Sequence, residues 1–140
     1  MSTDSTVDSC YLQDLPTIHR DEGELTVIEQ DTRRVYFIYD IPYSAKRGMH
    51  AHKTLKQIMI AIHGSFCVRL DDGHRSVIYR LSDPSVGLYI HRGIWREFFN
   101  FTDDAVVLVL ANERYDEDDY IRDYKEFLKY KCIYGNGIDC

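Results

Sequence analysis

Short hydrophobic segments, rich in valine, isoleucine, tyrosine and phenylalanine, recur along most of the chain and are separated by polar turn residues. Segments of this kind, bounded by Asp, Gly, Ser and Pro, are typical of β-strands. We expect strands at residues 25–30, 33–40, 57–64, 65–70, 76–81, 86–90, 94–101 and 105–111. The sequence DDGH at 71–74 favours a hairpin turn, because Gly73 can adopt a positive φ. Regular strands and turns over about ninety residues predict an antiparallel sandwich or barrel and not βαβ units.

The pattern changes near the C-terminus, where apolar side chains recur at steps of three and four residues. These side chains are Tyr120, Ile121, Tyr124, Phe127, Leu128 and Ile133. Acidic residues at 116–119 precede this stretch, and Lys125, Lys129 and Lys131 lie towards its end, an order that the helix dipole favours. We expect an amphipathic helix from about residue 116, packed on a β-barrel.

With 140 residues, the chain is long enough for one domain with its own core. We expect an N-terminal extension at 1–22 and a single domain at 23–140 that includes the helix. No segment approaches the roughly 20 apolar residues that span a bilayer, and the polar, acidic start resembles neither a signal nor a transit peptide. These features predict a cytoplasmic protein. Its four cysteines show no CxxC pair, so free thiols are expected.

The charge distribution suggests the kind of ligand. A formal net charge of -6 argues against a general nucleic-acid binder. However, six basic residues fall within 24 positions: Arg33, Arg34, Lys46, Arg47, Lys53 and Lys56. A local basic pocket in an acidic protein suits a small anionic ligand, although scattered, solvated surface charges remain an alternative.

His50 and His52 are two residues apart, so on a strand their side chains share one face. Here the sequence resembles the cupin family, whose first motif is H-x-H, four residues, an acid, six residues and a glycine. This chain matches the spacing as far as Gly64, but Gln57 replaces the acid. The second motif, P-x-G-x-x-H-x-x-x-N, corresponds to residues 91–100.

Within the second motif Gly93 and Asn100 match, His91 replaces the proline, and Arg96 occupies the position of the last metal-binding histidine. An amide is a weak ligand for zinc or ferrous iron, and a guanidinium repels a cation, so Gln57 and Arg96 argue against a metal site. We therefore expect no metal.

Two other interpretations of the histidine pair remain. In the first, the histidines are satisfied polar groups inside a barrel. The basic side chains expected to converge on the same cavity argue against it: Arg34, Arg47, Lys53 and Arg96. Burying this charge without an anionic ligand is costly. Because a neutral imidazole is a base with a pKa near working pH, the pair favours metal-free acid–base catalysis on an anionic substrate.

A narrower resemblance rests on five segments: RRVYFIYD (33–40), RGMHAHK (47–53), DPSVGLYI (83–90), IWREFFNF (94–101) and LVLANERYDEDDYIRDY (108–124). Together they are similar to the nucleotide-sugar 3,4-ketoisomerases of the cupin class, over about residues 23 to 128. The resemblance implies that the ketone of dTDP-4-keto-6-deoxy-D-glucose moves from C4 to C3, on the way to the dTDP-3-amino-3,6-dideoxyhexoses of lipopolysaccharide O-antigens. It implies no cofactor, no nucleic-acid or membrane partner, and a homodimer with exchanged N-terminal strands, here expected at 25–30.

The resemblance assigns catalysis to His50 and His52. We expect His50 to carry the proton between C3 and C4 and His52 to act on the oxygens, and the sequence leaves the reverse assignment open. Seven residues are expected to bind substrate: Arg34, Tyr36, Arg47, Lys53, Gln57, Ser65 and Arg96. Arg34 and Arg47 are the candidates for the diphosphate, because guanidinium groups match phosphate oxygens. Arg96 bears on the C4 stereochemistry of the product, which the sequence leaves open. A metal-dependent cupin enzyme and a non-catalytic nucleotide-sugar binding module are the alternatives.

Overall fold

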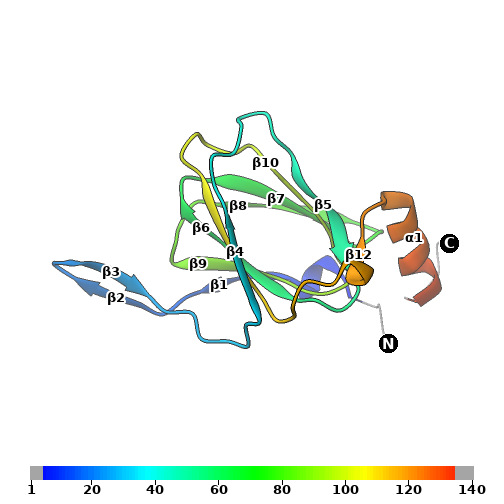
Figure 1. Ribbon diagram of the computed structural model, residues 1–140, viewed down its shortest axis with the longest axis horizontal. Coiled ribbons are helices and arrows are strands. Elements are labelled where there is room, and N and C mark those ends of the chain that lie inside the picture. Colours follow the sequence, from blue (N-terminus) through cyan, green and yellow to red (C-terminus); the bar gives the residue numbers. More distant parts are fainter. Residues whose placement is uncertain (1–4, 135–140) are drawn as a thin grey trace.

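Two antiparallel β-sheets face each other in the computed structural model, which describes residues 5–134 (Figure 1). Within these residues one five-stranded sheet has the order β1-β9-β6-β11-β4, and the other has the order β12-β5-β10-β7-β8. The strands are β1 (Tyr11–Asp14), β4 (Arg34–Ile38), β5 (Arg47–His52), β6 (Gln57–His63), β7 (Phe66–Asp71), β8 (Ser76–Leu81), β9 (Val86–Ile90), β10 (Trp95–Phe99), β11 (Val106–Ala111) and β12 (Tyr120–Ile121). The predicted antiparallel barrel is confirmed.

Alternating side chains decide which face of each strand is buried. On β11, Val107 and Val109 are buried between the sheets, while Val106 and Leu108 are only partly covered on the outer face. Phe66 and Phe101 meet inside the barrel with ring centroids 5.5 Å apart. Burial of each such ring contributes roughly 1.5–3 kcal/mol, so this layer of side chains is the main support for the strands that carry the site.

The C-terminal segment departs from the prediction at its start. The helix expected from residue 116 begins eight residues later, as α1 (Tyr124–Tyr134). The intervening residues form the 3₁₀-helix η2 (Glu117–Asp119) and then β12, which pairs with the edge strand β5. That pairing satisfies backbone groups of β5 that a continuous helix would have left open.

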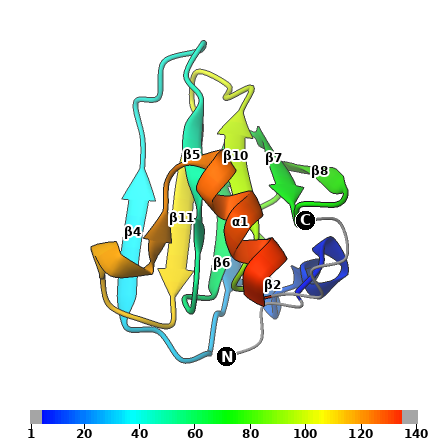
Figure 2. The ribbon, with the colours of Figure 1, turned by 90° about the vertical axis from the view of Figure 1, so that its right-hand side faces the viewer.

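Helix α1 covers the outer face of the sheet that contains β5 (Figure 2). Phe127 is fully buried there against Ala51, Trp95 and Ile121. This packing holds β12 against β5, and therefore fixes the segment that precedes the helix.

The N-terminal segment is also different from the expected extension at 1–22. Val7 and Cys10 lie in the main core, and β1 pairs with β9 as part of a barrel sheet. The buried Lys131 ties this segment to the helix, since its Nζ donates to the Ser5 carbonyl at 2.7 Å and to the Gly93 carbonyl at 3.1 Å. The described part of the segment up to residue 14 therefore belongs to the barrel.

The remaining strands, β2 (Thr17–Arg20) and β3 (Gly23–Thr26), form a hairpin that extends away from the barrel (Figure 1). The strand expected at 25–30 thus ends at Thr26, because β3 pairs only with β2 in the described chain. Ile18 and Leu25 are exposed on this hairpin.

Two further expectations can be compared with the described residues. Their helix is too short and too polar to cross a membrane. Cys10 and Cys67 are free thiols as expected, but Cys132 is disulfide-bonded, so the expectation of free thiols was wrong for that residue.

Candidate active site

The two histidines of β5 lie next to each other on its inner face, with ring centroids 4.9 Å apart. A β-bulge precedes them: Arg96 pairs with His50, Glu97 pairs with Gly48, and Met49 is left without a partner in the register. Gly48 and Met49 both have positive φ, 81° and 57°. Bulges of this kind redirect side chains next to functional sites.

The bulge also fixes the ring of His50. Its Nδ1 lies 2.9 Å from the Gly48 carbonyl oxygen. A carbonyl oxygen can only accept, so Nδ1 carries the proton and Nε2 keeps its lone pair. His50 is partly exposed, and its Nε2 is a potential base.

His52 is held differently. It is 1% exposed, and its Nδ1 lies 2.9 Å from Oδ2 of Asp119. The other carboxylate oxygen of Asp119 accepts from the backbone N–H of Thr54 at 2.7 Å and from its hydroxyl at 2.8 Å. Sequence reasoning assigned Asp119 to a helix start, and no local signal connects it with a histidine 67 residues away.

Tyr120 is a second residue that sequence reasoning missed, because its spacing fits the apolar face of a helix. Its ring centroid lies 4.4 Å from that of His52 and 5.0 Å from that of His50. Its hydroxyl accepts a hydrogen bond of 3.1 Å from Nη1 of Arg34, which joins β12 to β4 across the space between the sheets. The Arg34 guanidinium also lies 4.7 Å from the Tyr36 ring centroid, a cation–π contact.

Inside the barrel, two predicted residues present N–H groups without partners among residues 5–134. Arg96 is 0% exposed, and its Nη2 donates to the Ile94 carbonyl, but Nε and Nη1 have no partner there. Nε2 of Gln57, also buried, lacks a partner as well. Gln57 shares the inner face of β6 with core residues, and Arg96 does so on β10. Buried donors without acceptors are costly, so these groups suit a ligand that brings oxygen atoms.

Burial sets the charge of the site. It lowers the pKa of His50 to about 3, helped by the positive charge of Arg96. Burial likewise lowers the pKa of His52 to about 4, although the hydrogen bond to Asp119 opposes this shift. For Asp119, burial raises the pKa, but hydrogen bonds from His52 and Thr54 outweigh it and lower the pKa to about 2. Burial lowers the pKa of Arg96 to about 10. At neutral pH the site therefore holds two neutral imidazoles, a carboxylate and a guanidinium.

The metal site that the cupin class suggests does not fit these residues. Arg96 lies directly across from His50, and Nδ1 of His52 already bonds Asp119. A guanidinium repels a divalent cation, and the described residues contain no group of three metal-ligating side chains. No step of the chemistry below is assigned to a metal.

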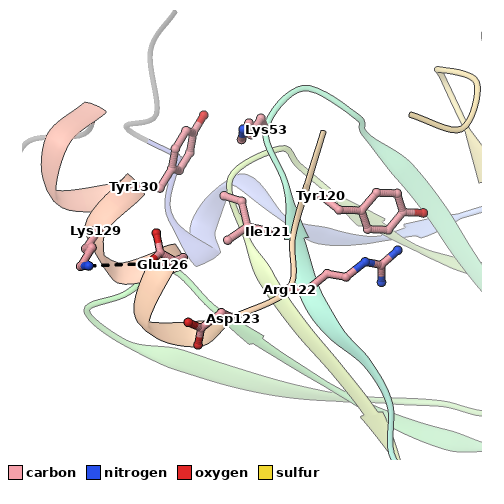
Figure 3. A pocket seen from close by; sticks show the side chains of 8 residues that line it. All are labelled: Lys53, Tyr120, Ile121, Arg122, Asp123, Glu126, Lys129 and Tyr130. Atoms are coloured by element: carbon pink, nitrogen blue, oxygen red, sulfur yellow. Dashed lines mark ion pairs between the residues drawn. The ribbon is translucent and has the colours of Figure 1, made fainter. Parts of the chain in front are cut away.

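Two of the predicted binding residues are not brought to the histidines. Ser65 lies between β6 and β7, beyond the end of β6 opposite to Gln57, and its hydroxyl accepts from Arg80 at 3.0 Å. Lys53 follows His52 and lines a pocket of about 600 Å³ beside α1, together with Arg122, Glu126 and Tyr130 (Figure 3). In that view the Tyr120 ring points away from the helix. The position of Lys53 follows from the alternation of side chains along a strand, because residues 51 and 53 lie on the face opposite to the histidines.

Arg34 is linked to the histidines through Tyr120 and to Tyr36 through a cation–π contact, whereas Arg47 is exposed at the start of β5. Arg34 and Tyr36 share the inner face of β4, whereas Val35 and Phe37 are exposed on the outer face. Burial raises the pKa of Tyr36, while the positive charges of Arg96, Arg34 and Arg47 lower it. The charges of these three arginines therefore act on one tyrosine, whereas Lys53, which was expected in the same cavity, lies elsewhere.

Comparison with known proteins relates this geometry to a reaction. A family model described as "FdtA: WxcM-like, C-terminal" matches residues 8–132. The chain is 43% identical over 114 residues to the TDP-4-oxo-6-deoxy-alpha-D-glucose-3,4-oxoisomerase of Aneurinibacillus thermoaerophilus, an alignment that covers 77% of this chain and 82% of that enzyme.

Among solved structures, QdtA from Thermoanaerobacterium thermosaccharolyticum, a sugar 3,4-ketoisomerase in complex with TDP, gives a TM-score of 0.85 at 41% identity, covering 89% of this chain and 95% of that one. A histidine-to-asparagine variant of QdtA in complex with TDP-4-keto-6-deoxyglucose gives a TM-score of 0.86 at 41% identity, covering 89% and 96%.

Proposed function

The chain belongs to the FdtA family of sugar 3,4-ketoisomerases, and we propose that it moves the ketone of TDP-4-keto-6-deoxyglucose from C4 to C3. The family resemblance of the sequence is confirmed. The 3-keto product is a substrate for amination at C3, which is consistent with the expected route to 3-amino-3,6-dideoxyhexoses.

The observation that carries the proposal is the pair of adjacent neutral imidazoles beside a buried guanidinium. Nδ1 of His50 is engaged by Gly48, and Nδ1 of His52 is engaged by Asp119. Both rings therefore keep an unprotonated Nε2, and two bases are available within one small space. A site that only binds a sugar nucleotide does not need two imidazoles held in this state.

The reaction needs one carbon base and one relay between oxygens. The C4 ketone makes the C3 proton acidic, and Nε2 of His50 removes it, so that the electron pair of the C3–H bond forms the C3–C4 double bond of an enediolate. His52 takes the proton of the C3 hydroxyl and passes it to the C4 oxygen. His50 then returns its proton to C4, leaving a ketone at C3 and a hydroxyl at C4. Atoms balance, and no redox cofactor takes part.

The unpaired donors suit the charge that develops on oxygen. Nε and Nη1 of Arg96, which is opposite His50 on the neighbouring strand, and Nε2 of Gln57 are buried, and buried N–H groups stabilise an enediolate more strongly than water does. We assign these residues to the sugar oxygens and not to the diphosphate. Arg34, which is half-buried, and Arg47, which is exposed, are assigned to the diphosphate, and Tyr36 to the sugar.

We further propose a homodimer in which the β2–β3 hairpin contacts the partner subunit. The hairpin pairs with no other strand of the described chain, and Ile18 and Leu25 on it are exposed. Edge strand β4 exposes Val35 and Phe37 as well. Exposed apolar side chains on unpaired edges favour association of this kind.

The proposal is tested by incubating the protein with TDP-4-keto-6-deoxyglucose in deuterium oxide and following C3 and C4 by NMR. We expect loss of the C3 proton signal and appearance of a 3-keto product, with deuterium at C4 in those turnovers in which the proton on His50 exchanges with solvent before it is returned. Binding of TDP without exchange at C3 would instead support a non-catalytic binding module.

A further inference from the structure

Asp119 connects the catalytic strand to the segment that follows it. The residue is 8% exposed, and its own carbonyl accepts a hydrogen bond of 2.9 Å from the backbone N–H of Lys53. Its carboxylate bonds Thr54 through Oδ1 and His52 through Oδ2. Three consecutive residues after Ala51 are therefore tied to one aspartate.

The division of the two carboxylate oxygens determines the state of His52. The backbone N–H of Thr54 is always a donor, so Oδ1 is committed to it. The Thr54 hydroxyl has one proton and two carboxylate acceptors within reach, Asp119 at 2.8 Å and Glu113 at 2.7 Å. Oδ2 of Asp119 is left for His52, and an ionised carboxylate only accepts, so Nδ1 of His52 must carry its proton.

We infer that Asp119 is the positioning residue for His52: it holds the imidazole in the Nδ1-protonated form and directs the unprotonated Nε2 to the substrate. The inference rests on the proposed function, in which Nε2 of His52 takes the proton of the C3 hydroxyl and gives it to the C4 oxygen. While His52 carries that proton, the carboxylate faces an imidazolium, and it stays ionised throughout. Asp119 itself touches no reacting atom.

The charged and titratable groups around His52 explain why an anion is needed at this place. His50 lies beside it on β5, and the Tyr120 ring lies at 4.4 Å. Arg96 and Arg34 both disfavour the protonated form of His52, whereas Asp119 favours it. Without the carboxylate, His52 would have to accept a proton next to two cations.

Replacing Asp119 by asparagine is informative because the amide has one acceptor and one donor end. The backbone N–H of Thr54 requires the amide oxygen, so the amide NH₂ turns towards Nδ1 of His52. Nδ1 must then accept, and the ring proton moves to Nε2. A role of Asp119 in folding alone would not move this proton.

The test uses protein labelled with ¹⁵N in histidine, with the His52 signals identified by their loss in His52→Asn. In the wild type we expect the proton of His52 on Nδ1, and in Asp119→Asn on Nε2. We expect kcat of Asp119→Asn to fall by roughly 10²–10⁴-fold, the usual value of a general base, with KM changed little. Asp118→Asn is the matched control, since Asp118 is an exposed neighbour in the same 3₁₀-helix, and it should leave both readouts unchanged.

Three results would overturn the inference: a wild-type His52 protonated on Nε2, an Asp119→Asn protein that keeps the Nδ1 proton, or one whose ring proton moves while kcat stays at the wild-type value. If Asp119→Asn does not fold, the wild-type spectrum decides alone. A wild type with the Nδ1 proton on His52 but without isomerase activity contradicts the proposed function and leaves the positioning of His52 supported.

Discussion

Arg96 lies directly opposite His50 on the neighbouring strand, with its guanidinium completely buried and two of its nitrogen atoms without partners among the described residues. In the proposed reaction this pair supplies a base and a cation where charge develops on the sugar oxygens. Burial and this cation disfavour protonation of His50 and lower its pKa to about 3, well below the value near working pH that the sequence predicted, so the imidazole is neutral and its lone pair is free before substrate binds. The guanidinium that disfavours a metal ion at this place thus suits the proposed acid–base chemistry.

His50→Asn should bind TDP-4-keto-6-deoxyglucose with near-normal affinity but lose most turnover. An amide retains much of the shape and hydrogen bonding of imidazole but is no base at neutral pH. We expect a loss of roughly 10²–10⁴ in kcat, or about 3–5 kcal/mol of barrier. Deuterium exchange at C3 measures the step directly, and His63→Asn, at an exposed histidine, is the control. Wild-type exchange in both His50→Asn and His52→Asn would show that the pair is structural.

Activity should survive metal removal. Gln57 and Arg96 occupy positions where metal-dependent cupins carry ligands, and the charge of Arg96 opposes a cation. Turnover measured after extensive EDTA treatment should match that of untreated protein. Loss of turnover that zinc, iron or manganese restores would establish the metal-dependent alternative.

Acidification should destabilise the protein through its two inner histidines. Their pKa values, about 3 for His50 and about 4 for His52, lie below the ordinary histidine value of 6.5. At pH values between these folded-state pKa values and 6.5, the histidines are protonated in the unfolded chain but not in the folded chain. The free energy of unfolding therefore falls as the pH drops below about 6.5. Urea titrations at pH 7 and pH 5 should show this loss, and it should be smaller in His50→Asn. An equal loss in the variant would contradict the assignment.

Gly48→Ala should cost more stability than Gly73→Ala. Both glycines have positive φ, 81° and 94°, which costs an alanine of the order of 1 kcal/mol. A Cβ at Gly48 would also lie 3.0 Å from the Arg96 carbonyl oxygen, whereas at Gly73 its nearest neighbour is 3.7 Å away. Thermal unfolding of the two variants measures the difference. Equal melting temperatures would show that the bulge adjusts without strain.

The protein should be a homodimer in solution. Light scattering at micromolar concentration should give twice the chain mass, and Leu25→Asp on the hairpin should shift it towards the monomer. Ile78→Asp on β8 is the control, because Ile78 is 61% exposed and Leu25 is 56% exposed. A wild-type monomer, or equal effects of the two substitutions, would contradict an interface on the hairpin.

Most strand positions could be predicted from the sequence alone, and so could the placement of His50 and His52 on one face of a strand. Both follow from local periodicity, because alternation along a strand fixes which side chains share a face whatever the topology. The same rule placed Arg34 with Tyr36, and the cupin spacing placed Gln57 and Arg96 inside the barrel. The expectation that Lys53 joins the basic side chains of the cavity was wrong, because alternation directs residue 53 to the face opposite to the histidines.

Contacts between residues that are far apart in the sequence could be identified only from the folded structure. Asp119 reaches His52 across 67 positions, and Tyr120 reaches Arg34 across 86. The local pattern around Asp119 and Tyr120 predicted the start and the apolar face of a helix. In the structure β12 pairs with the edge strand β5 and satisfies its backbone groups, and the helix begins only at Tyr124. Ser65 lies beyond the end of β6 that is opposite to Gln57. The length of the strand therefore separates it from Gln57, although the two residues are close in sequence. Periodicity encodes the face of an element, whereas its neighbours depend on the free energy of packing the whole chain.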